Sequence, residues 1–82
     1  MITVVYFAWL RERVGQGSEQ VETNAKTVAE LVDQLRGMDS YHAAAFVDIR
    51  AVRVAVDQVL TDFDAPIAAA REVAFFPPMT GG

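Results

Sequence analysis

The 82-residue chain contains no cysteine, which excludes disulfide bonds, thiolate nucleophiles and cysteine-based metal sites together. A secreted domain of this size usually needs covalent cross-links, so we expect a cytoplasmic location. The start, MITVVYFAWL, has no basic segment before its apolar run. No apolar run approaches the length of about 18 residues that a membrane crossing requires. We therefore expect neither export nor a membrane partner.

Basic residues are also scarce. Lysine and arginine together number 7 against 11 acidic residues, for a net charge of −4. A nucleic-acid-binding protein needs a basic face, so we expect no nucleic acid among the partners. The one histidine, His42, has no second ligand or nucleophile near it in the sequence. Asp62 and Asp64 alone are too few for a metal site. We expect no catalytic histidine and no bound metal.

Four largely apolar segments predict short strands, and the mostly polar segment 18–22 is expected to pair back onto the first of them as a hairpin, which makes five strands. They cover residues 2–8, 18–22, 52–56, 59–60 and 72–76. Asp57 and Gln58 are expected to form a tight turn between the third strand and the fourth. Pro77 and Pro78 end the last strand, because proline cannot donate a hydrogen bond to a sheet.

The clearest helix is predicted over residues 27–35, where Thr27 and Glu30 have the spacing of a capping box. Gly37 stands where a glycine commonly ends a helix, and a shorter helix is expected over residues 41–46. One main helix is enough to cover one face of one sheet. The predicted fold class is therefore α+β, a ubiquitin-like β-grasp with one mixed sheet of about five strands covered on one face by the main helix.

Both faces of this sheet are expected to be apolar. We assign to the helix-covered face Ile2, Val4, Tyr6, Val52, Val54, Val56, Val73 and Phe75. Val5, Phe7 and Phe76 then point outward, joined by Leu60. Two interpretations remain open, because either loops and the second helix cover these residues or a protein partner does.

The chain ends FFPPMTGG, which predicts a folded domain over residues 1–76 and an extended, flexible tail over residues 77–82. The prolines stiffen the exit, and six residues at ~3.3 Å each reach about 20 Å. Gly81 and Gly82 can pass a narrow channel because they have no Cβ. We interpret the tail as an arm that delivers the Gly82 carboxylate. The sequence has no phosphate-binding loop, so a partner must activate that carboxylate.

Three segments closely resemble the small-subunit family of molybdopterin synthase. They are YFAWLRERVG at 6–15, VAVDQVLTDFDAPI at 54–67 and EVAFFPPMTGG at 72–82. The resemblance implies a sulfur carrier that is not an enzyme on its own. In such a carrier, an E1-like enzyme uses ATP and Mg²⁺ to adenylate Gly82, and a sulfur donor converts it to a thiocarboxylate. The sulfur is then delivered to cyclic pyranopterin monophosphate in the large synthase subunit.

The same resemblance implies the site residues and the assembly. Gly82 is the reacting terminus and Gly81 precedes it in the tail, and the family's partner-facing positions correspond to Phe7, Leu60, Phe76, Pro77, Pro78, Met79 and Thr80. The implied assembly is a heterotetramer, with a small subunit at each end of a large-subunit dimer and no cofactor bound by the small subunit. One departure is the sequence Ala-Ala-Arg at residues 69–71, where the family usually has Asp-Gly-Asp. A positive φ there would be unfavourable for alanine.

Other functions stay open at this stage. A carrier of another sulfur pathway, such as thiamine thiazole synthesis, would use the same terminus. A ubiquitin-like protein modifier would join Gly82 to a lysine side chain of another protein. An interaction module with an accidental terminus is the third alternative.

Overall fold

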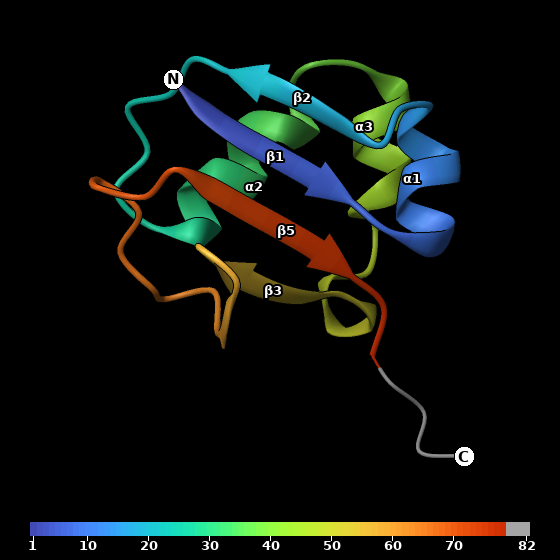
Figure 1. Ribbon diagram of the computed structural model, residues 1–82. Coiled ribbons are helices and arrows are strands. Elements are labelled where there is room, and N and C mark those ends of the chain that lie inside the picture. Colours follow the sequence, from blue (N-terminus) through green and yellow to red (C-terminus); the bar gives the residue numbers. More distant parts are fainter. Residues whose placement is uncertain (79–82) are drawn as a thin grey trace.

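The computed structural model describes residues 1–78. Its strands form one five-stranded sheet in the order β2-β1-β5-β3-β4 (Figure 1). The strands are β1 (Ile2–Tyr6), β2 (Ser18–Val21), β3 (Arg53–Val56), β4 (Val59–Thr61) and β5 (Glu72–Phe76). The central pair, β1 and β5, is parallel and the other pairs are antiparallel. The predicted mixed β-grasp sheet is confirmed.

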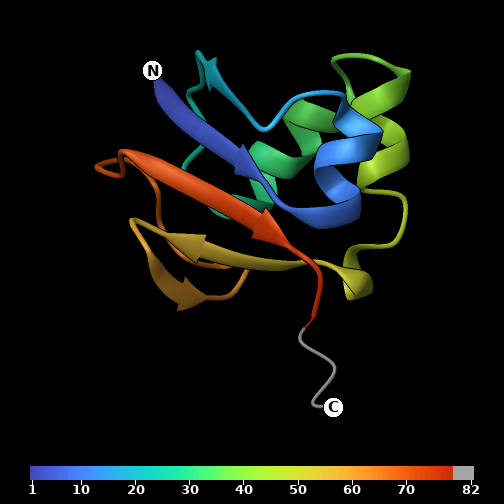
Figure 2. The same ribbon diagram turned by 45° about the vertical axis from the view of Figure 1, so that its right-hand side comes forward.

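Helices cover one face of this sheet, as the two views together show (Figure 1 and Figure 2). They are α1 (Ala8–Val14), α2 (Val28–Arg36), α3 (Ser40–Ala45) and the short 3-10 helix η1 (Ile49–Ala51). The main helix α2 lies behind the sheet, while α1 and α3 lie beside each other past the end of β1. None of the helices within residues 1–78 has the length and apolarity that a membrane crossing requires.

The core lies between α2 and the inner face of the sheet. Every residue assigned from the sequence to this face is buried, except Val56, which is partly buried. The stripe of α2 that meets them is also buried and consists of Val28, Leu31, Val32 and Leu35. Tyr6, Phe46 and Phe75 form an aromatic cluster, in which the rings of Phe46 and Phe75 meet edge to face at 4.9 Å between centroids. The alternation of the strands therefore determined the inner face correctly.

The N-terminus of α2 has the predicted capping bond to Thr27, while the Glu30 side chain bonds to the backbone one residue before Thr27. Thr27 Oγ1 accepts a hydrogen bond from the Glu30 N–H at 3.3 Å, while Glu30 Oε1 accepts from the Lys26 N–H at 3.1 Å. At the other end, Gly37 stands at the predicted position but is right-handed, with φ −82°. Among residues 1–78, the glycine with a left-handed backbone conformation is Gly15, with φ 92°, at the end of α1.

The turn between β3 and β4 also fixes the start of β5. Asp57 and Gln58 both have positive φ, at 48° and 70°, which suits the twist of a two-residue hairpin. Asp57 Oδ1 accepts hydrogen bonds from the N–H groups of Arg71 and Glu72, each at 2.9 Å. Residues 69–71 have no positive φ, so Ala-Ala-Arg causes no backbone strain in this segment.

Candidate functional site

The face of the sheet turned away from the helices carries a continuous apolar row. The register pairs Val5 with Ala74, Ala74 with Ala55, and Ala55 with Leu60. Residues directly opposite each other on neighbouring strands point to the same face. One row therefore crosses four strands, from β1 through β5 and β3 to β4, and its outermost member Leu60 is 69% exposed. We call this row, together with Phe7 and Phe76, the outer face.

Phe7 and Phe76 lie at the end of the outer face from which the chain leaves the sheet. Phe7 directly follows β1, and its N–H donates to the Phe75 carbonyl at 3.0 Å. Ala8 has a positive φ of 54°, which turns the chain sharply into α1, and the Phe7 side chain is 51% exposed. Phe76 is the last residue of β5 and is partly buried, as are Pro77 and Pro78 after it.

The structure thus brings Phe7, Phe76, Pro77 and Pro78 together at one end of the sheet, while Leu60 lies on the edge strand β4. Within residues 1–78, the loops and α3 leave Phe7 and Leu60 largely exposed. Apolar side chains gathered in this way are typical of a surface that another protein covers. The remaining predicted site residues, Met79, Thr80, Gly81 and Gly82, lie outside the described residues.

Some residues on this side of the sheet, among them Ala55, Ala74 and Arg53, were not predicted as part of the site. Ala55 and Ala74 complete the row between Val5 and Leu60, and Arg53 lies opposite Phe76. The alternation of residues 52–56 does put Arg53 and Ala55 on the face opposite the buried valines. However, only the strand register shows which residues of β1, β4 and β5 lie beside them.

The buried His42 forms a polar network away from the outer face. Its Nε2 lies 2.7 Å from Glu19 Oε2, and its Nδ1 lies 2.8 Å from Asp39 Oδ1. Because both ring nitrogens face carboxylate oxygens, both are donors, and only the imidazolium has two N–H groups. Glu19 Oε2 also accepts from the Tyr6 hydroxyl at 2.7 Å. The network therefore links α3 to β1 and β2.

Burial and hydrogen bonding in this network shift the pKa values of His42, Asp39 and Tyr6. Burial alone would lower the pKa of His42, but its hydrogen bonds to Glu19 and Asp39 outweigh burial and raise it above the usual 6.5. Hydrogen bonds from the backbone and side chain of His42 lower the pKa of Asp39. Burial and the bond to Glu19 raise the pKa of Tyr6, which keeps its hydroxyl protonated and able to donate.

These shifts predict how stability depends on pH. Since the pKa of His42 is raised in the folded state, its contribution is complete below the unfolded value near 6.5. That contribution is lost as pH rises through the folded pKa. We expect the free energy of unfolding, measured by urea denaturation, to fall as pH rises above about 6.5 and through the raised folded pKa of His42. His42→Gln should flatten this slope and cost about 2–4 kcal/mol at the lower end of this range.

Tyr41→Gln is the matched control, because Tyr41 is the exposed neighbour of His42 on the same helix. It should retain the pH slope of the unaltered protein. An equal slope in the His42→Gln variant would show that the network does not hold a charged histidine.

A family match, two full-length sequence relatives and a solved structure of the same fold show which proteins this chain is similar to. The chain matches the family described as the ThiS family over residues 4–82. This chain belongs to the ThiS family. The match includes every described residue of the outer face, and the resemblance to sulfur carrier subunits that the sequence predicted is confirmed by full-length relatives.

Two such relatives of this ThiS-family chain carry the name molybdopterin synthase sulfur carrier subunit. The chain is 40% identical to the protein from Escherichia coli and 32% identical to the one from Haemophilus influenzae, each over 82 residues and 100% of both chains. A solved structure with the same fold is the Haloferax volcanii small archaeal modifier protein 1. It matches with a TM-score of 0.73 and 25% identity, over 95% of this chain and 97% of that chain.

Proposed function

We propose that this ThiS-family chain is the sulfur-carrying subunit of a molybdopterin synthase. The observation that carries the proposal is the outer face, whose apolar row is exposed at Leu60 and which ends at Phe7 and Phe76, where the tail leaves the sheet. Support comes from the two full-length relatives of that name. A carrier needs such an arrangement, because a partner that holds the domain by this face also receives the tail.

Chemical activation precedes sulfur loading in this proposal. The Gly82 carboxylate is a poor electrophile, so an E1-like enzyme with ATP and Mg²⁺ converts it to an acyl-adenylate, and pyrophosphate leaves. A sulfur donor then supplies the nucleophile that displaces AMP, and a carbon–sulfur bond replaces the carbon–oxygen bond to the adenylate. The chain itself binds no cofactor and catalyses neither step.

Delivery then takes place in the large subunit. The outer face anchors the domain, and the fixed φ of Pro77 and Pro78 directs the tail away from it. Six residues from Pro77 onward can span about 20 Å when fully extended, which is long enough for Gly82 to enter an active site inside the partner. There the thiocarboxylate sulfur forms a bond to a carbon of cyclic pyranopterin monophosphate. Hydrolysis of the resulting thioester breaks the bond between that sulfur and the Gly82 carbonyl carbon, which leaves the sulfur on the substrate and restores the Gly82 carboxylate. A second delivery supplies the other sulfur of the dithiolene. The proposed assembly is a heterotetramer located in the cytoplasm.

The alternative is a ubiquitin-like protein modifier, which the similarity to a small archaeal modifier protein favours. A sulfur carrier for thiamine thiazole synthesis is the other alternative, because its first activation step is the same. All three functions use Gly82, and they differ in what finally accepts the activated group.

The test is the intact mass of the protein recovered from its own cells, with fragmentation to locate any change. We expect a species heavier by the exchange of one oxygen for one sulfur, located at Gly82, and its loss when the purified large subunit and cyclic pyranopterin monophosphate are added. Isopeptide-linked adducts at Gly82 in place of that species would make the chain a modifier. A sulfur-bearing species that the large subunit does not discharge would favour another sulfur pathway.

A further inference from the structure

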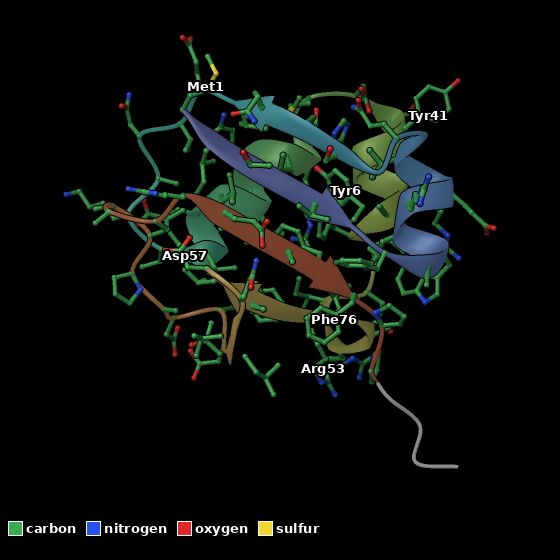
Figure 3. All side chains as sticks on the ribbon, viewed as in Figure 1. Met1, Tyr6, Tyr41, Arg53, Asp57 and Phe76 are labelled. Atoms are coloured by element: carbon green, nitrogen blue, oxygen red, sulfur yellow. The ribbon has the colours of Figure 1, made fainter. Side chains whose placement is uncertain are left out.

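Arg53 is the cation that stands beside the tail exit on the outer face. It lies directly opposite Phe76 in the antiparallel pairing of β3 and β5, so the two side chains share that face. Figure 3 shows Arg53 and Phe76 next to each other where the chain leaves the sheet. Arg53 is exposed, while its neighbours along the strand, Val52 and Val54, are buried in the core.

The guanidinium of Arg53 is held by two backbone carbonyls but has no anionic partner among residues 1–78. Its Nη1 donates to the carbonyls of Arg50 at 2.9 Å and Val52 at 3.1 Å, which hold the side chain at the start of β3. No described carboxylate lies within 4 Å of it, whereas nearby Arg50 is paired with Asp48 at 3.1 Å. Nε and Nη2 therefore remain for a two-point contact with a carboxylate.

The opposite end of the outer face carries a negative charge, that of Glu72. Glu72 is paired with Thr3 and, four residues before Phe76 on the same strand, points to the same face. The separation along β5 is about 13 Å. The outer face thus has a cation at the tail exit, an apolar middle and a carboxylate at the far end.

We propose that Arg53 pairs with a carboxylate that the sulfur-accepting large subunit presents beside the entrance to its tail channel. This inference rests on the proposed function. A partner seated on Phe76 also covers Arg53, and a cation removed from water without an acceptor is unfavourable. A carboxylate at that point satisfies Nε and Nη2, and its attraction orients the domain so that the tail faces the channel.

The experiment measures binding of the purified large subunit to the unaltered chain and to two charge-reversal variants, at low and at physiological salt. Arg53→Glu should weaken binding by at least about tenfold, mainly through faster dissociation, and should reduce the salt dependence. Arg50→Glu is the matched control, because that cation is exposed, lies on η1 and is already paired with Asp48. It should change affinity by less than about threefold.

Arg53→Gln keeps hydrogen-bond donors at the site and removes only the charge, so it replaces the reversal variant if Arg53→Glu does not fold. It should weaken binding by at least about threefold. If the unaltered chain binds the large subunit and both Arg53 variants bind equally well, the pairing is wrong while the proposed function stands. If the unaltered chain does not bind the large subunit at all, the proposed function fails. A dimer of this chain that Arg53→Glu dissociates would assign the face to a second copy and overturn the pairing.

Discussion

One residue added after Gly82, or the deletion of Gly82, is expected to reduce sulfur transfer at least about 100-fold. The reacting carbon lies at the end of an arm whose length is fixed, and a displacement of about one residue moves it by ~3.3 Å. In the extended variant the glycine carboxylate is also consumed by a peptide bond. The measurement is single-turnover conversion of cyclic pyranopterin monophosphate by the reconstituted synthase.

The matched control is one residue added before Met1, which is exposed and lies at the opposite end of the molecule from the tail exit (Figure 3). Transfer should be unchanged in that variant, and thermal unfolding should be unchanged in all three. An extended variant that still transfers sulfur would show that Gly82 is not the delivered group.

Phe75→Ala is expected to lower the free energy of unfolding by about 3–5 kcal/mol. Phe75 is fully buried, and its ring lies 6.2 Å from that of Tyr6 and 4.9 Å from that of Phe46, measured between centroids. The substitution leaves a cavity in the centre of the aromatic cluster. Urea denaturation measures the loss.

Phe76→Ala is the matched substitution one residue later, on the other face of β5. Because Phe76 is only partly buried in the free chain, its loss should cost less than about 1 kcal/mol of stability. We expect it instead to weaken the complex with the large subunit by about 1–3 kcal/mol, as measured by calorimetry. Unchanged affinity together with a large loss of stability would place Phe76 in the core and remove it from the interface.

The sequence by itself determined the elements and the inner face. The bounds predicted for the last strand, residues 72–76, are those of β5, because apolar residues precede two prolines there. The predicted cap at Thr27 is present. These features depend on neighbours within about four positions, and such local preferences can be read from one chain. The two-residue alternation likewise determined which side of β1, β3 and β5 is buried.

Only the tertiary structure decided which distant residues meet. Strand register places Arg53 beside Phe76 and connects Leu60 to Val5 through Ala55 and Ala74. Tertiary folding brings His42 on α3 within hydrogen-bonding distance of Glu19 on β2, 23 residues away in the sequence. The side chain of Asp57 accepts hydrogen bonds from the N–H groups of Arg71 and Glu72 at the start of β5, more than ten residues later in the sequence.

The physical reason is that period and composition decide which face of an element is apolar, but not how far one element slides along the next. A shift by one residue in register would turn every outward side chain of a strand inward. The core permits only one alternation on each strand, yet registers two residues apart satisfy it equally. The choice between them is made by turns such as Asp57-Gln58 and by the fit of the whole core, and it is this choice that assembles the outer face.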